Sequence, residues 1–483
     1  MRKPDVLERG ALQGALAGFV SSVMFTAAMV RLGMPFAAVP FDPGRSMLSA
    51  ELVQLTLATI GGAGFGVIVW QQRFGAGEML FWGMAYGIVK WFAVPLTLLP
   101  LLRHAAVTWS VEAAQAAIPS LFGYLLYGAG TGLLLASLRP AALARTGKLQ
   151  GVVLRGAAAG LAATWALGLI LKAQGRSLEF MATSDPGIHS GARWAVILAG
   201  SLAGVGFAWL YPSPTGSGPG LVRGTMYGFF LWVAAGLTVM PLIAGSGLAW
   251  SLAAARTHYA TLPGYILAGA GVALFYQWVT ALVRLLFSDD IVGQGDEGLG
   301  ARGLRLTGRG AVAGLVGGLL FTIIMVRMDQ LPTVARLIGS SSPWTGFSVH
   351  LIIAEIIGAS YGLLFARQSY DIGSGLGWGV SYGFFWWTLG PLTLEPILLG
   401  VGPRWTAATA AGLLPGLVGH LLYGAGLGVV FHLLEARYSP WWIPHTDAEA
   451  SAAAHRRDQV LTSAPAVWAF VVVTAFTLPI LLA

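Results

Sequence analysis

The chain has 483 residues and a net charge of +8; 56 % of its residues are apolar, only 10 % are charged, and its mean hydropathy is +0.72. Globular domains in water carry roughly 25 % charged residues, so this chain lacks the polar surface that a soluble protein of its size needs. The composition therefore excludes a soluble enzyme, a disordered scaffold and a secreted disulfide-rich domain, and the absence of cysteine excludes thiolate chemistry.

Apolar stretches of about 20 residues follow one another along the whole chain, and each is long enough to cross a ~30 Å hydrocarbon core as a helix. Thirteen such helices are predicted, over 11–31, 51–70, 79–100, 119–137, 153–172, 193–211, 223–243, 261–285, 310–327, 345–366, 375–398, 411–434 and 464–483. Glycine accounts for 67 residues, which suits helices that pack closely in lipid through small side chains.

The sequence also repeats itself in a constant register. Three motifs return after 296 residues: FTAAMVR at 25–31 as FTIIMVR at 321–327, YGIVKWFAVPLTLLP at 86–100 as YGFFWWTLGPLTLEP at 382–396, and GYLLYGAGTG at 123–132 as GHLLYGAGLG at 419–428. A middle copy lies 141 residues after the first, so that Tyr227 matches Tyr86 and Trp232 matches Trp91. The sequence therefore predicts three tandem copies of a four-helix unit, followed by a thirteenth helix.

The number of helices per copy fixes how the copies are related. Four is even, so every copy enters the membrane from the same side, and we expect parallel repeats around an axis along the membrane normal. The predicted fold class is all-α and polytopic. Its divisions are a first transmembrane repeat at 1–150, a second at 151–300, a third at 301–440, and a linker with the last helix at 441–483.

The basic residues indicate an orientation. With a cytoplasmic N-terminus, the inner connections hold 17 lysines and arginines and the outer connections hold 10. Because cytoplasmic loops carry the excess of basic residues, we expect a protein of the inner (cytoplasmic) membrane with its N-terminus inside and its C-terminus outside. The expected surroundings are a lipid bilayer, and no nucleic-acid partner is predicted.

None of the connections is long enough to hold a separate domain. The stretch 441–460 contains histidines and carboxylates, but we interpret it as a solvated linker, and no metal site is predicted. Each copy has a short segment between its third and fourth helices that carries a tryptophan: Trp109, Trp250 and Trp405. We interpret these three side chains as anchors at the level of the lipid headgroups.

Ionisable side chains inside a membrane span are costly, so each one is a candidate functional residue. In the third copy, Glu355 and His420 lie on helix faces rich in small residues, about ten residues from the outer ends of their helices, which at ~1.5 Å per residue puts both near the middle of the membrane. We expect the two to form a pair that serves as a proton relay or solute site, or else as a buried polar clasp that fixes helix register.

Four more side chains are candidates to extend this site. His350 lies nearer the outer end of its helix, and Glu395 lies between two prolines where the helix must break, so both also suit an interfacial position. Tyr423 follows His420 by three residues, on the same helix. Lys90 lies in a span of the first copy and is expected to meet Glu355 if the copies close around a common centre; the second copy is expected to bury no charge.

Familiar catalytic motifs do not occur in the sequence: it has no phosphate-binding loop, no His-Glu-x-x-His pair and no nucleophile elbow. We therefore predict that the protein is not an enzyme but a carrier or channel for a small solute or a proton, through the polar site of the third copy. The alternative is a non-catalytic subunit of a larger membrane electron-transfer complex that contacts a quinone, a pigment or a haem. No cofactor is predicted, although a haem on a single histidine, or a membrane enzyme, forms a third alternative.

Overall fold

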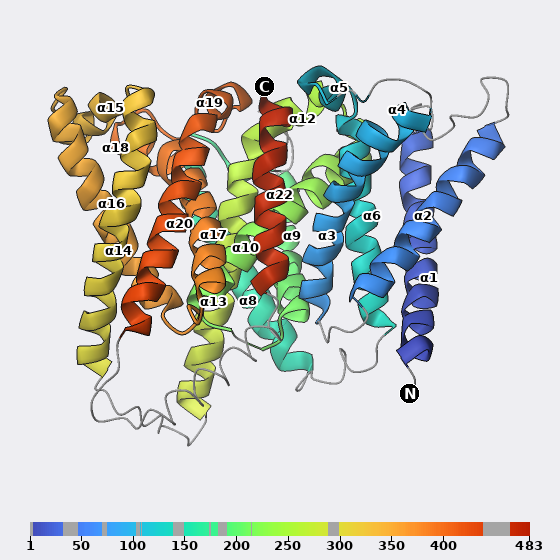
Figure 1. Cartoon of the computed structure of the whole chain (residues 1–483), viewed down its shortest axis with the longest axis horizontal. Helices are drawn as coiled ribbons and strands as arrows, with labels where there is room; N and C mark the ends of the chain where they lie inside the picture. The colour runs from blue at the N-terminus through green and yellow to red at the C-terminus, as the bar shows by residue number, and fades with distance from the viewer. Residues whose placement is uncertain are drawn as a thin grey trace.

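A computed structural model describes residues 3–31, 47–69, 75–102, 107, 109–138, 149–172, 175–181, 191–213, 215–287, 299–437 and 464–483. Within these ranges every regular element is a helix and no strand occurs. The long helices run side by side as one bundle, and the two ends of the chain lie at opposite ends of that bundle (Figure 1).

The elements, in chain order, are α1 (Lys3–Arg31), α2 (Met47–Val69), α3 (Ala76–Ala93), η1 (Val94–Leu98), α4 (Leu99–Leu102), α5 (Val111–Ala116), α6 (Ile118–Ser137), α8 (Leu149–Lys172), η2 (Leu178–Met181), α9 (Gly191–Leu210), α10 (Ser217–Leu231), η3 (Trp232–Val239), α11 (Met240–Ile243), α12 (Leu252–His258), η4 (Tyr259–Thr261), α13 (Leu262–Phe287), α14 (Leu299–Arg327), α15 (Leu331–Ala335), η5 (Arg336–Ile338), α16 (Pro343–Phe365), α17 (Ile372–Leu389), η6 (Gly390–Leu394), α18 (Glu395–Leu398), α19 (Ala407–Gly412), α20 (Leu414–Ala436) and α22 (Ala464–Leu482).

Ten helices of the described ranges are long and apolar enough to cross a membrane. Two others, Gln54–Val69 in α2 and Trp194–Leu210 in α9, are apolar but shorter. The remaining predicted span, 375–398, is formed by α17, η6 and α18 in succession. The structure thus confirms an all-α protein that spans a lipid bilayer several times.

Glycines allow the long helices to approach closely in pairs. α1 packs on α2, α3 on α6, α8 on α9, α10 on α13, α14 on α16, and α17 on α20. Where α17 crosses α20, a Cβ atom on Gly379 or on Gly424 would overlap the backbone carbonyl of the other residue. Gly83 and Gly128 stand in the same relation where α3 crosses α6. Small residues at such crossings bring helix backbones into van der Waals contact, which drives helix association in lipid.

The helices α3, α10 and α17 do not break at their prolines but widen into the π-helical segments η1, η3 and η6. In each segment a threonine hydroxyl donates to the carbonyl oxygen five residues earlier and accepts the indole N–H of a tryptophan. The pairs are Thr97 with Trp109, Thr238 with Trp250, and Thr393 with Trp405. The prolines remove backbone N–H groups from these segments, and the threonine hydroxyl supplies a hydrogen-bond donor there. The predicted helix break at Glu395 is therefore wrong, because α17 continues through η6 into α18.

These tryptophans differ in their surroundings. Trp109 is 77 % exposed, whereas Trp250 and Trp405 are each 1 % exposed. The prediction that all three lie among lipid headgroups is wrong for the last two, because their indoles are enclosed by protein.

The last helix, α22, lies in the middle of the bundle (Figure 1). It contacts α3, α10 and α17, and also the short helices α5, α12 and α19. The ring of Phe470 stacks on Phe81 of α3, with 5.9 Å between centroids, and meets Phe229 of α10 edge-on at 5.7 Å. Trp468 meets Trp378 of α17 edge-on at 5.5 Å. This helix, which the sequence leaves outside the repeat, therefore joins all three parts of the chain.

A charge is buried in the middle part of the chain. Arg223 of α10 is 1 % exposed; its guanidinium group lies 4.9 Å from the ring centroid of Tyr211 and donates to the hydroxyl of Thr215. The expectation that the second copy buries no charge is therefore wrong. The sequence places Arg223 in an inner connection, but α10 begins six residues earlier, at Ser217, and turns this side chain into the bundle.

Candidate functional site

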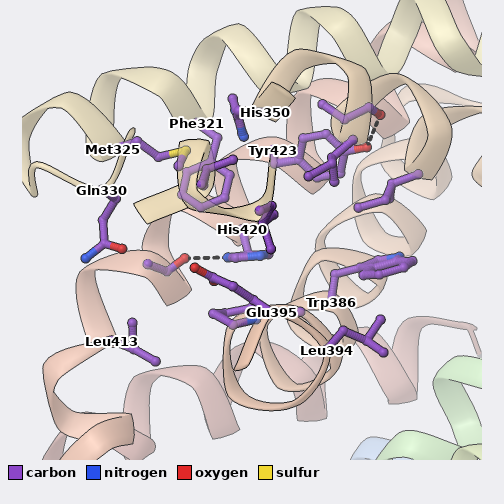
Figure 2. A pocket seen from close by; sticks show the side chains of 18 of the residues that line it. Phe321, Met325, Gln330, His350, Trp386, Leu394, Glu395, Leu413, His420 and Tyr423 are labelled. Atoms are coloured by element: carbon purple, nitrogen blue, oxygen red, sulfur yellow. Dashed lines mark hydrogen bonds between the residues drawn. The ribbon is translucent and has the colours of Figure 1, made fainter. Parts of the chain in front are cut away.

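A cavity of about 240 Å³ lies between α14, α16, α20 and the π-helical turn that joins α17 to α18, with α15 beside it (Figure 2). Its walls are mostly apolar. The polar atoms come chiefly from Gln330, His350, Glu395, His420 and Tyr423. The elements α15 and α18 lie at the end of the bundle where the chain terminates, so the cavity belongs to that half of the protein (Figure 1).

Phe321 of α14 positions the two histidine rings. Its ring centroid lies 4.6 Å from that of His420 and 5.3 Å from that of His350. The phenyl ring fits because a glycine faces it: a Cβ atom on Gly419 would overlap it. Gly416, one turn earlier in α20, is buried, yet a Cβ atom there would meet nothing within 4 Å. Gly419 thus makes room for the phenyl ring, and Gly416 leaves the space of the cavity open.

The hydrogen of the neutral His420 ring is located by a backbone contact. Nδ1 lies 2.8 Å from the carbonyl oxygen of Gly416. A carbonyl oxygen only accepts, so Nδ1 is the donor and Nε2 carries the lone pair. Nε2 faces the turn between α17 and η6, where a Cβ atom on Gly390 would lie 3.8 Å away. His420 therefore presents a hydrogen-bond acceptor to the cavity.

Two further side chains also give their hydrogens to helix carbonyls. Nε2 of His350 lies 3.0 Å from the carbonyl oxygen of Gly318 and must donate to it. The phenol of Tyr423 donates to the carbonyl oxygen of Ala354 over 2.8 Å. What remains for a ligand is Nδ1 of His350 and the lone pairs of the phenol oxygen, and both are acceptors.

Glu395 begins α18, and its carboxylate points toward His420 (Figure 2). The side chain is half-buried. In the part of the chain that the structure describes, its carboxylate accepts no hydrogen bond. Arg336 and Arg404 are exposed and lie near enough to stabilise its negative charge. These two cations favour the ionised form of a carboxyl group that is otherwise set among apolar walls, and no described side chain occupies it, so it is available to a ligand.

Glu355 does not line the cavity. Its neighbour Ala354 lies in the cavity wall, and one residue along a helix turns the side chain by about 100°. Among the described residues, no hydrogen bond or ion pair joins Glu355 to His420. The expected pair therefore does not form, and the carboxylate that faces His420 belongs to Glu395.

Lys90 lies in the first part of the chain, on α3. Its ammonium group is 4.3 Å from the ring centroid of Tyr127 and 5.7 Å from that of Tyr124. A Cβ atom on Gly61 would meet this ammonium group, so the glycine makes room for it. Within the described ranges no ion pair joins Lys90 to Glu355, and the expected meeting of the two does not occur. The faces of two tyrosine rings stabilise the charge instead.

A smaller cavity of about 110 Å³ lies in the middle part of the chain. Seven residues that line it each precede a residue of the larger cavity by 155 positions: Ala195, Ala199, Leu231, Ala235, Met240, Tyr265 and Ala268 correspond to His350, Ala354, Trp386, Gly390, Glu395, His420 and Tyr423. Of the seven in the smaller cavity, only Tyr265 is polar. The two cavities thus occupy corresponding positions, but only the larger one has a carboxylate and a histidine there.

The sequence analysis missed Phe321, Trp386 and Gln330, which also line the larger cavity. Phe321 and Trp386 belong to motifs that recur along the chain, so their recurrence is the signal that could have found them. Gln330 lies outside every predicted span, and no pattern in the sequence distinguishes it.

No group of three His, Asp or Glu side chains able to hold a metal occurs within the described ranges; the linker at 441–460 lies outside them. Comparison of the chain with models of protein families, with curated proteins and with solved structures gives no match. The geometry of the cavity is therefore the basis for assigning a function.

Proposed function

We propose that this membrane protein is a carrier for a small solute, and that the solute occupies the cavity of about 240 Å³. One observation carries the proposal: His350, Glu395 and His420 converge on a space whose walls are mostly apolar (Figure 2). In cavities of this kind the apolar walls bind a small molecule and the few polar groups orient it. Glutamate and histidine each gain or lose one proton, so the same site can link solute binding to proton binding.

We also propose that the chain consists of three parallel four-helix copies, at 1–150, 151–300 and 301–440, followed by α22. Recurring hydrogen bonds support this division. The indoles of Trp91, Trp232 and Trp387 each donate to a carbonyl oxygen 26 residues later, at Ala117, His258 and Leu413. Tyr127 donates to Ala58 as Tyr423 donates to Ala354, in both cases over 69 residues. For the orientation we propose an inner membrane and a cytoplasmic N-terminus, on the distribution of basic residues.

A second candidate is a non-catalytic subunit of a larger membrane complex. The apolar walls of the cavity favour this function, because the ring of a quinone would fit among apolar and aromatic side chains such as Phe321 and Trp386. Purification in a mild detergent separates the two candidates. A partner retained in fixed stoichiometry supports the subunit, whereas a chain that purifies alone supports the carrier.

Blocking the cavity tests the carrier. In the Gly416→Phe variant a phenyl group enters the open space at residue 416, and we expect uptake to fall by about tenfold or more, because a filled site cannot hold a solute. The measurement is uptake into proteoliposomes of labelled choline, lactate and sorbitol, and of protons through an internal pH indicator. Proteoliposomes that contain the wild-type protein are expected to take up at least one of these four probes faster than protein-free vesicles do.

The matched control is Gly412→Phe. A Cβ atom on Gly412 also meets nothing within 4 Å, but this residue is exposed and does not line the cavity. Its uptake should equal that of the wild-type chain. The carrier proposal fails if wild-type vesicles take up none of the four probes, or if Gly416→Phe leaves uptake unchanged.

A further inference from the structure

We infer that the cavity of the third copy binds a protonated alkyl amine. The inference rests on the proposed carrier and narrows its solute to one chemical class. Two independent features lead to it: the hydrogen-bonding character of the cavity, and the side chain that fills the corresponding place in the first copy.

The titratable side chains of the cavity present acceptors. His350, His420 and Tyr423 each give a hydrogen to a helix carbonyl and keep lone pairs for a ligand. The carboxylate of Glu395 is also an acceptor. The side-chain amide of Gln330 offers both kinds of group, and the indole N–H of Trp386 is a buried donor with no hydrogen-bond partner among the described residues. A ligand that fits this arrangement must bring several hydrogens, as an ammonium group does.

The charge of the cavity has the sign that a cation requires. Glu395 is the one carboxyl group of the lining, its negative charge would be stabilised further by a bound cation, and none of the lining residues is a lysine or an arginine. Arg336 and Arg404, whose charges act on Glu395, are exposed at the end of the bundle and do not line the cavity. The aromatic rings of Phe321, Trp386 and Tyr423 add faces on which an ammonium group is stabilised.

The first copy contains such a ligand as part of its own chain. Lys90 stands at the position of Trp386, and its ammonium group lies 4.3 Å from the ring centroid of Tyr127, the counterpart of Tyr423. It also lies 5.7 Å from the ring centroid of Tyr124, the counterpart of His420. A lysine side chain is four methylene groups and an ammonium, which is the structure of butylammonium. The fold thus accommodates an alkylammonium beside these two rings, and in the third copy the counterpart side chains Tyr423 and His420 line a cavity that also contains the carboxyl group of Glu395.

The test uses butylammonium as the probe, on the full chain in lipid nanodiscs at neutral pH. Labelled butylammonium is measured by equilibrium dialysis, and unlabelled butanol and butyrate compete against it as neutral and anionic analogues. We expect one saturable site for butylammonium. Butanol and butyrate should each bind to it with an affinity lower by about tenfold or more, since a charge-assisted hydrogen bond is roughly twice as strong as a neutral one.

Two variants identify the site. Glu395→Gln should lower the affinity for butylammonium by about tenfold or more and leave the affinity for butanol unchanged, because only the charged partner is removed. The control is Glu112→Gln, which changes an exposed carboxyl group on α5. Trp386→Lys should abolish binding, because the new side chain occupies the cavity as Lys90 does in the first copy. Its control is Leu231→Lys, at the same place in the second copy, which should leave binding unchanged.

The possible failures are distinguishable. If butanol or butyrate binds the cavity as tightly as butylammonium, or if Glu395→Gln binds butylammonium like the wild-type chain, the amine is the wrong class while a solute site remains. If none of the three compounds binds, and choline, lactate, sorbitol and protons are not transported either, both the carrier proposal and the amine proposal are wrong.

Discussion

Gly424→Leu is expected to cost about 3 kcal/mol or more of folding stability, since a side chain forced into a closely packed contact must displace its neighbours. Its Cβ atom would overlap the carbonyl oxygen of Gly379, which is backbone and cannot rotate away. The crossing of α17 and α20 would open, and the wall of the cavity that these helices form would move with it. Thermal unfolding in detergent, followed by circular dichroism, measures the loss.

The control for this substitution is Gly412→Leu, at a residue where a Cβ atom meets nothing within 4 Å. It should unfold within a degree or two of the wild-type chain, because exposed substitutions away from special contacts change stability by about 0.5 kcal/mol or less. Equal unfolding temperatures for both variants would show that the two helices do not cross at these glycines.

Phe470→Ala is expected to destabilise the protein by about 3 kcal/mol, the usual cost of removing a buried phenyl ring. Phe470 is completely buried, and its ring contacts both Phe81 and Phe229. The loss should also loosen α22 from the two helices that carry those residues. Limited proteolysis of the purified protein, together with thermal unfolding, measures both effects.

Phe476 of α22 is a matched control on the same helix, because its side chain is 71 % exposed. Phe476→Ala should leave both the unfolding temperature and the proteolysis pattern unchanged. If Phe470→Ala behaves in the same way, α22 is a peripheral helix and not the central contact of the bundle.

Much of the fold can be predicted from the sequence, because a lipid environment constrains helix length and composition. Apolar length locates the spans, and the recurring motifs mark the same helix faces in distant parts of the chain. The place of α22 cannot be read in this way, because it follows no copy of the unit and its residues are apolar on every side. The π-helical turns are also hidden, since prolines predict a break and only the threonine hydroxyls, bonded five residues back, allow the helix to continue.

The candidate site was accessible to sequence reasoning only in part, since depth in the membrane does not say which way a side chain points. Glu355 and His420 have similar depth, yet Ala354 and not Glu355 lies in the cavity wall. Glu395 reaches His420 because α17 continues through η6 into α18 and does not end at its first proline. His350 enters the wall through its bond to Gly318, a contact between two helices that no local pattern indicates.

Chemical modification of a single thiol in the cavity is the most direct test of the claim that this space takes an ammonium ligand. The wild-type chain has no cysteine, so a Gly416→Cys thiol is the only one present, and a Gly412→Cys thiol is its control outside the cavity. The account predicts that an ethylammonium methanethiosulfonate modifies the thiol at residue 416 faster than the ethylsulfonate analogue does, and that butylammonium slows this reaction but not the one at residue 412. Equal rates for the two reagents at residue 416, with no protection by butylammonium, would contradict it.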